Sequence, residues 1–175
     1  RNAFGTFGGK MKNALYLALL FPSCLLAAEE YGSYFSPGLR IGWDFSGGLT
    51  FGGKISVGVL RDADLNNSMF FNVTVGFKAP ISGKQKLWYR EYNFVQAQFG
   101  LLAKRDTGFF IGGGLGMASL KHNPAKRKPM LTLFAGSLIF AETDFIFDRD
   151  RLVSTDFGLL AILPIPLSGF DFGLN

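Results

Sequence analysis

The stretch Gly48–Leu60 reads GLTFGGKISVGVL and alternates between two kinds of side chain. The apolar residues share one parity: Leu49, Phe51, Ile55, Val57 and Val59. The other parity carries only glycine and small or singly charged groups: Thr50, Gly52, Lys54, Ser56 and Gly58. Successive side chains of a β-strand point to opposite faces, so the stretch predicts a strand with one apolar and one small, polar face. Glycine stands where a water-exposed strand would carry charge, and this favours a strand with lipid outside and a narrow polar interior.

The same two-residue period predicts eight strands along the chain. They are expected at Pro37–Ser46, Gly48–Leu60, Ser68–Lys78, Glu91–Ala103, Gly108–Ser119, Met130–Ala141, Leu152–Leu163 and Gly169–Asn175. Segments of about ten residues are long enough to cross a bilayer at a tilt. Leu120–Pro129 is expected to be a basic loop, and Glu142–Arg151 either extends the sixth strand or forms a turn. The predicted fold class is all-β: an eight-stranded antiparallel up-and-down transmembrane β-barrel.

The amino-terminal region has the features of a secretory signal peptide. Met11 and Lys12 precede an apolar run that ends at Ala28, which is too short for a confident membrane-spanning helix. We expect residues 1–10 to lie upstream of the initiator, residues 11–28 to be the signal peptide, and residues 29–175 to form the outer-membrane barrel domain. Cys24 offers an alternative processing site, at which it would become the lipidated amino-terminal cysteine of a lipoprotein. After Ala28 the chain has no cysteine, which excludes a disulfide, a thiol nucleophile or a zinc–cysteine site.

The basic character of the chain is weak support for a nucleic-acid partner. The chain has 18 Lys and Arg against 13 Asp and Glu, for a formal charge of +5. Three of the basic residues, Arg1, Lys10 and Lys12, precede the expected cleavage site, so the excess falls to +2. A nucleic-acid partner is therefore not expected, since binding would need a basic face on the folded domain.

A barrel with lipid outside predicts where two groups of residues lie. Arg40, Asp44 and Lys54 lie on the polar parity and are expected to form a structural charge cluster in the barrel interior. Aromatic residues near strand ends are expected to form girdles at the two membrane interfaces. The expected girdle residues are Trp43, Phe45, Trp88, Tyr89, Tyr92, Phe109 and Phe110. The competing interpretation is a soluble barrel or sandwich whose apolar face points inward.

These features resemble the small eight-stranded bacterial outer-membrane barrels, the group of the OmpA transmembrane domain and OmpX. The resemblance covers residues 35–175 and rests on the strand pattern, with no diagnostic motif. It implies a monomer in the bacterial outer membrane, in contact with lipids and lipopolysaccharide, and inserted by the barrel-assembly machinery. The chain departs from the group at its last residues, Phe172-Gly173-Leu174-Asn175, where an aromatic terminus is usual.

Little in the sequence indicates chemistry. Lipid A-modifying barrel enzymes share this size, and their deacylase uses a histidine with a serine two residues later. Here the only histidine is His122, and Pro124 stands two residues after it. No metal site and no cofactor are expected, because no His, Asp and Glu cluster has ligand spacing.

The basic residues of the expected loop are a candidate contact for the phosphates of lipopolysaccharide. They are Lys121, Lys126, Arg127 and Lys128, and the alternative is an exposed loop that keeps the rim soluble. The sequence thus favours a non-enzymatic outer-membrane protein with an envelope-structural or surface-interaction role. A lipid A-modifying enzyme and a periplasmic barrel that binds an apolar ligand remain the alternatives.

Overall fold

The computed structural model describes residues 31–45, 48–61, 68–81, 91–104, 107–121, 123–149 and 151–168. Every regular element in these ranges is a β-strand. No helix within them is long and apolar enough to cross a membrane. The expected signal peptide and the expected last strand, Gly169–Asn175, lie outside the described residues.

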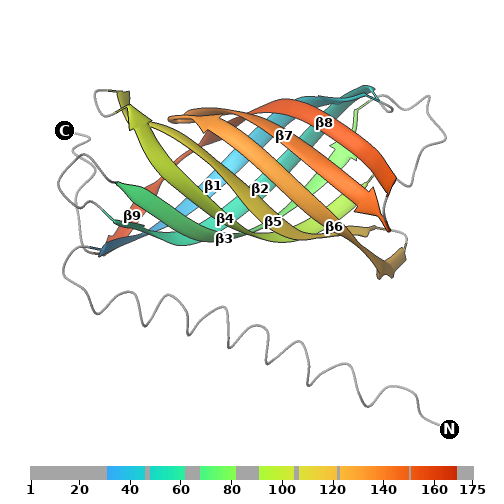
Figure 1. Cartoon of the computed structure of the whole chain (residues 1–175), viewed down its shortest axis with the longest axis horizontal. Coiled ribbons are helices and arrows are strands. Elements are labelled where there is room, and N and C mark those ends of the chain that lie inside the picture. Colours follow the sequence, from blue (N-terminus) through green and yellow to red (C-terminus); the bar gives the residue numbers. More distant parts are fainter. Residues whose placement is uncertain are drawn as a thin grey trace, which may run out of the picture.

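Nine strands follow one another along the chain (Figure 1). They are β1 (Tyr31–Asp44), β2 (Gly48–Arg61), β3 (Met69–Pro80), β4 (Tyr92–Lys104), β5 (Phe109–Leu120), β6 (Asn123–Gly136), β7 (Ile139–Asp148), β8 (Arg151–Ile162) and β9 (Ile165–Ser168). Each strand from β2 to β8 pairs antiparallel with its sequence neighbours, and β1 pairs with both β2 and β8. The sheet therefore closes into an eight-stranded antiparallel barrel, and the predicted fold class is confirmed.

The register around the barrel fixes its stagger. Starting at Asp44 and following paired residues through all eight strands leads back to β1 at Tyr34, ten residues earlier. For eight strands this stagger corresponds to a strand tilt of about 40°. We call the end where β1 begins the proximal end, and the end where β1 finishes, at Asp44, the distal end.

The seam of the barrel uses β8 and β9 as one interrupted strand. β8 pairs with the distal half of β1, and β9 pairs with Ser33–Phe35 nearer its start. Pro164 separates the two segments, while the Leu163 amide still donates to the Pro37 carbonyl at 3.0 Å. Within the described residues the barrel already closes through the pairing of β1 with β8 and β9.

The expected sixth strand, Met130–Ala141, is wrong, because a hairpin turn lies inside it. β6 ends at Gly136 with φ of 156°, and β7 begins after Ser137 and Leu138. Glu142–Arg151, expected as an extension or a turn, instead supplies most of β7, and the turn is confined to the region of Arg149, whose φ is 55°.

The expected basic loop Leu120–Pro129 is also wrong, because β6 already begins at Asn123. This first part of β6 pairs with β5 only, since the pairing of β6 with β7 starts at Met130. Pro124 and Pro129 are compatible with a strand that has one free edge, where a missing amide costs no ladder bond. The β5–β6 hairpin consequently projects beyond β7 at the distal end (Figure 1).

The outer and inner faces of the barrel wall differ in polarity in the way that the sequence predicts. Large apolar side chains are exposed on the outer surface, among them Leu39 (64 %), Leu115 (70 %) and Leu133 (50 %). The inner face holds the buried charged residues, which are Arg40, Asp44, Lys54, Lys78, Glu142, Asp144 and Asp156. The barrel is thus apolar outside and charged inside, the reverse of a water-soluble barrel.

Glycines on the inner face leave the space that the long inward side chains occupy. A Cβ built on Gly100 would lie 2.3 Å from the Phe70 ring, and one on Gly112 would lie 2.6 Å from the tip of Phe134. The narrow bore is therefore filled by placing a ring over a glycine of a neighbouring strand.

We predict that Gly112→Ala destabilises the barrel by about 1–3 kcal/mol, because overpacking a filled interior forces the backbone to shift. The new Cβ would also lie 2.2 Å from the Phe99 carbonyl oxygen, which cannot rotate away. Ala97→Val, an outward-facing change on β4, is the control and should leave stability unchanged. Urea unfolding of the micelle-bound protein measures both. Equal midpoints for Gly112→Ala and the parent would contradict the packing described here.

Candidate functional site in the barrel interior

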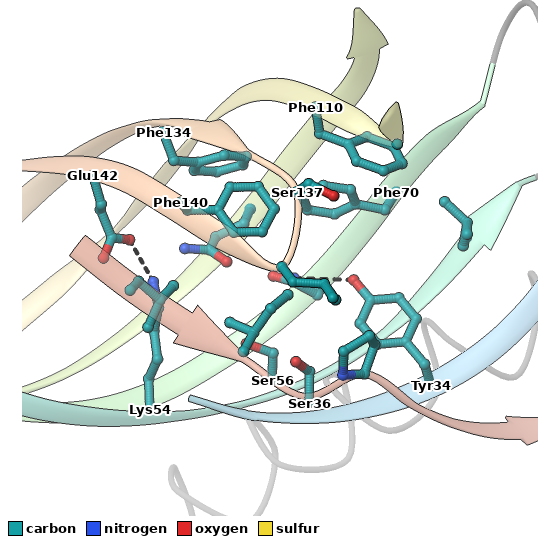
Figure 2. Close-up of a pocket in the computed structure, with 18 residues that line it drawn as sticks. Tyr34, Ser36, Lys54, Ser56, Phe70, Phe110, Phe134, Ser137, Phe140 and Glu142 are labelled. Atoms are coloured by element: carbon teal, nitrogen blue, oxygen red, sulfur yellow. Dashed lines mark hydrogen bonds and ion pairs between the residues drawn. The ribbon is translucent and has the colours of Figure 1, made fainter. Parts of the chain in front are cut away.

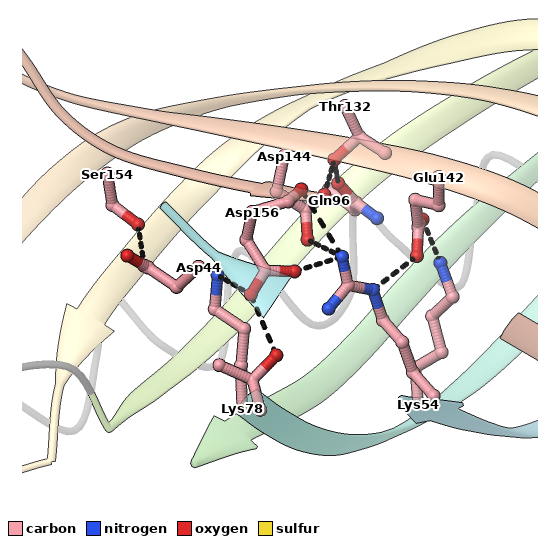
Figure 3. A network of polar contacts seen from close by, with 11 residues as sticks. Asp44, Lys54, Lys78, Gln96, Thr132, Glu142, Asp144, Ser154 and Asp156 are labelled. Carbon is pink, nitrogen blue, oxygen red and sulfur yellow. Dashed lines mark hydrogen bonds and ion pairs between the residues drawn. The ribbon is translucent and has the colours of Figure 1, made fainter. Parts of the chain in front are cut away.

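A network of charges crosses the bore (Figure 3). Arg40 on β1 is the cation with the most ion pairs in this network among the described residues. Its Nε donates to Glu142 Oε2 at 3.2 Å, and its Nη2 forms an ion pair with Asp156 Oδ1. The same Nη2 lies 3.6 Å from Asp144 Oδ2. One guanidinium therefore faces three carboxylates on β7 and β8, a geometry that suits its planar set of donors.

Two glycines make room for this guanidinium. A Cβ on Gly42 would lie 2.7 Å from Arg40 Nη1, and one on Gly158 would lie 2.9 Å from Arg40 Cζ. Both glycines pair with each other across β1 and β8. Backbone carbonyl oxygens of Ile41 and Phe157 approach the same two positions, so the glycines are required by the pairing of β1 with β8 as well as by the Arg40 side chain.

Three aspartates lie side by side on adjacent strands. Asp44 pairs in register with Asp156, and Asp156 pairs with Asp144. Like charges directly opposite each other destabilise a sheet, so this row needs compensation. Arg40 supplies part of it, and Lys78 Nζ lies 3.4 Å from Asp156 Oδ2.

Hydroxyl groups satisfy further carboxylate oxygens of this row. Thr50 Oγ1 donates to Asp156 Oδ2 at 2.8 Å, and Ser154 Oγ donates to Asp44 Oδ2 at 2.6 Å. Thr132 Oγ1 donates to Asp144 Oδ1 at 2.7 Å. Buried charges are stable only when they are paired and hydrogen-bonded, and these hydroxyls help to meet that condition.

The network connects strands that are far apart around the barrel. Lys54 on β2 forms an ion pair with Glu142 on β7, and Lys78 on β3 reaches Asp156 on β8. The buried interior holds three cations and four carboxylates within the described residues. This arrangement braces opposite walls and fills the middle of the bore.

The prediction of an interior cluster named Arg40, Asp44 and Lys54, and the structure places all three inside the barrel. Arg40 and Lys54 meet through Glu142, whereas Asp44 contacts Ser154. Four partners were not predicted from the sequence: Lys78 as a network member, and Glu142, Asp144 and Asp156. Their signal was available, because each stands on the inward parity of its strand.

Two of the expected girdle residues, Tyr92 and Phe110, point into the barrel and not towards its outer surface. Tyr92 is 3 % exposed and packs inside the distal half of the barrel with Ala118, Met130 and Ile146. Phe110 packs inside the proximal half, with its ring 5.3 Å from that of Phe70. Neither residue can belong to an outer girdle, because both lie on the inward parity.

Other aromatic residues do face outward. Trp43 and Phe45 are exposed near the distal end, Phe109 is half-buried, and Trp88 and Tyr89 lie outside the described residues. Three exposed rings that the sequence analysis did not assign to a girdle join Trp43 and Phe45: Phe51, Phe77 and Phe157. The Phe51 and Phe77 rings contact each other edge to face at 6.3 Å, and Phe157 pairs in register with Trp43.

The expected phosphate contacts lie at the distal end. Lys121 forms an ion pair with Glu91 at 2.7 Å, and Lys128 forms one with Asp148 at 3.3 Å. Lys126 and Arg127 are exposed on the projecting part of β6. His122 lies outside the described residues.

A cavity of about 350 Å³ occupies the proximal half of the bore (Figure 2). Aromatic rings form much of its wall, and the Lys54–Glu142 ion pair closes it towards the network. Its proximal boundary consists of turn and strand-end residues, including Gly108, Ser137 and Pro164. Within the residues that the structure describes, no group of three or more His, Cys, Asp and Glu side chains could hold a metal ion.

We predict that Arg40→Met destabilises the barrel by about 3–5 kcal/mol, because it leaves buried carboxylates without their shared cation. Lys121→Met is the matched control. It removes a cation from an ion pair in which the Lys121 side chain is 62 % exposed, and should cost less than about 1 kcal/mol. Unfolding in urea, followed by tryptophan fluorescence, compares the two. A cost for Arg40→Met as small as that of the control would show that the network does not brace the barrel.

Comparisons with known proteins add the following. No protein-family model and no curated protein sequence matches the chain. A solved structure described as "De novo design of transmembrane beta-barrels" is similar with a TM-score of 0.37 and 12 % sequence identity. That similarity covers 74 % of this chain and 95 % of the designed one.

Proposed function

We propose that this protein is a non-enzymatic bacterial outer-membrane barrel of the OmpA and OmpX type. Its role is envelope-structural or consists of surface interactions made by the distal loops. The observation that carries the proposal is the inverted barrel wall, with exposed leucine, isoleucine and phenylalanine outside and buried charges inside. Hydrocarbon is the solvent in which such an outer surface is stable.

The dimensions of the wall fit a bilayer. Strands β1 to β8 have 10 to 14 residues, and at the tilt given above twelve residues span about 30 Å. Charged side chains on the outer parity lie towards strand ends, as Arg61 and Arg127 do. The apolar band therefore has charged borders where lipid headgroups would begin.

The connections support an orientation with the distal end outside the cell. The longest connection, β3–β4, lies at this end and runs from Ile81 to Glu91, whereas the longest proximal connection, β2–β3, spans residues 62–68. The β5–β6 hairpin also projects at the distal end. Outer-membrane barrels have short periplasmic turns and longer external loops. Insertion by the barrel-assembly machinery and a monomeric state belong to the same proposal.

The filled bore argues against a porin. In eight-stranded barrels the interior is just wide enough for side chains, and here Arg40 and its partners occupy its middle. A wall with a braced interior suits a protein whose interactions are made at its rim.

Lipopolysaccharide is the partner that the distal rim fits. Lys126 and Arg127 are exposed there and form no ion pair within the described ranges, so their charges are available to phosphate. Lys121 and Lys128 are already paired with Glu91 and Asp148, and they contribute less free charge. We propose that this side of the β5–β6 hairpin contacts lipid A or core phosphates.

Membrane insertion predicts a depth-dependent cost for a charge on the outer wall. Leu115→Lys, at mid-height on β5, should destabilise the barrel in lipid vesicles by about 2–4 kcal/mol. Leu152→Lys, an equally outward change at the distal start of β8, should cost about 0–1 kcal/mol, because it lies at the interface. Unfolding in urea from vesicles gives both values. A soluble barrel would tolerate both lysines alike and without lipid, and that result would reject the proposal.

The phosphate contact predicts that a Lys126→Gln, Arg127→Gln double variant binds lipopolysaccharide several-fold more weakly. The measurement is titration of the barrel in nanodiscs with fluorescent lipopolysaccharide, at two salt concentrations, because exposed charge pairs are screened by salt. Lys104→Gln, which removes an exposed charge at the proximal end, is the control and should leave affinity unchanged. Equal affinities for the double variant and the parent would exclude this contact.

A further inference from the structure

We propose that the proximal cavity is a binding site for a single-chain amphiphile with an uncharged, oxygen-bearing head, such as a fatty alcohol. This inference goes beyond the proposed envelope role. The cavity lies inside the wall, and the distal rim plays no part in it. The cavity combines apolar walls, buried donors without partners and a charged closed end.

The apolar part of the cavity is a set of interlocked rings. Phe70 stacks on Phe134 with centroids 5.7 Å apart and an angle of 17°. Phe140 meets Phe134 edge to face at 5.8 Å, and Phe110 meets Phe70 in the same way. Figure 2 shows these four rings along one side of the space. Rings held by one another present a preformed apolar surface, and an apolar chain gains by leaving water to contact it.

Two buried polar atoms line the same cavity without a partner. Ser36 is 3 % exposed and Gln98 is 5 % exposed. Neither Ser36 Oγ nor Gln98 Nε2 has a hydrogen-bond partner within the described residues. Gln98 Oε1 accepts from Thr74 Oγ1 at 3.1 Å, so in the structure the amide nitrogen is the end that is left over. Buried donors left unpaired are costly, so a ligand that accepts from them would bind favourably.

Tyr34 adds a third donor. Its hydroxyl oxygen accepts from Asn72 Nδ2 at 3.2 Å, so the phenolic proton remains to be donated (Figure 2). A tyrosine hydroxyl, a serine hydroxyl and an amide NH₂ on one cavity wall call for an acceptor. An alcohol, ether or ester oxygen has the lone pairs for this, whereas an ammonium group has none.

The closed end of the cavity disfavours an anion. Lys54 is already paired with Glu142, and Glu142 also accepts from Arg40. The buried interior carries four carboxylates against three cations. A ligand carboxylate would add a negative charge to a low-dielectric space that already has an excess of one, so an uncharged head is preferred.

The volume of the cavity limits the size of the ligand, and the position of its mouth determines the direction from which the ligand enters. The cavity volume of about 350 Å³ equals that of roughly a dozen waters, given about 30 Å³ each. A ten-carbon alcohol has about as many non-hydrogen atoms as the cavity could hold waters, so it matches the cavity in size. Gly108, Ser137, Leu138 and Pro164 line the proximal boundary, so the ligand enters along the barrel axis from that end.

The test uses decanol on the protein in nanodiscs made of deuterated lipid. Decanoate and decylammonium serve as matched probes with charged heads. We expect nuclear Overhauser contacts from the decanol chain to the rings of Phe70 and Phe134, and at least tenfold weaker binding of both charged probes. Because bilayer-dissolved decanol touches only the outer wall, these inward ring contacts distinguish the cavity from the membrane.

Variants complete the test once heat-modifiable gel mobility shows that they fold. Ser36→Ala and Gln98→Leu should each weaken decanol binding about five- to tenfold, since each removes one donor. Val57→Ala, on the outer wall of β2, should leave it unchanged. Absence of ring contacts at saturating decanol would overturn the proposal. So would unchanged affinity in both donor variants, or decanoate binding as tightly as decanol.

Discussion

The ion pairs of Arg40 are the interaction on which the interior depends. The guanidinium is the shared cation for Glu142, Asp144 and Asp156, and it joins β1 to β7 and β8 across the bore. Without it, three aspartates in register on adjacent strands would repel one another in a low-dielectric space. Side chains at positions 42 and 158 would collide with this guanidinium and with the backbone of the paired strand, and glycine avoids both contacts.

This interior determines what the outside can be. A wall that keeps its charges in the bore leaves its large apolar side chains on the outer surface, and a closed sheet leaves few unpaired backbone groups there. The bore itself has three parts that differ in their side chains. Its middle is a brace, its distal half combines charges with an apolar cluster around Tyr92, and its proximal half keeps a cavity with aromatic walls.

The sequence predicts the architecture well because a period of two is sufficient to assign faces. Arg40 and Lys54 could be placed inside from parity alone. The second to fifth strands lie close to their expected bounds, whereas β1 begins at Tyr31 and not at the expected Pro37. The hairpin at Ser137 was missed because Leu138, Ile139 and Phe140 continue the apolar character of β6, although Gly136-Ser137 is a recognised turn signal. Glu142 and Asp144 suggested a turn because acidic residues are rare in strands. Their pairing with Arg40 on β1 becomes visible only in the folded structure.

The cavity could not be predicted from the sequence at all. Its rings come from β3, β5, β6 and β7, and its donors from β1 and β4, so it exists only through the ten-residue stagger. Tyr92 and Phe110 illustrate the related limit for aromatic residues. Their positions near strand ends suggested interfacial girdles, but parity decides the face, and both rings point inward.

The most direct test of this account is the solvent that each face of one strand contacts. Spin labels on cysteines introduced at Ile55, Ser56 and Val57 would report collisions with oxygen, which enriches in lipid, and with a water-soluble nickel chelate. We predict high oxygen and low nickel accessibility at 55 and 57, and low accessibility to both at 56, because Ser56 is buried in the bore. High nickel accessibility at 55 and 57 would mean that water surrounds the barrel, and it would contradict the account.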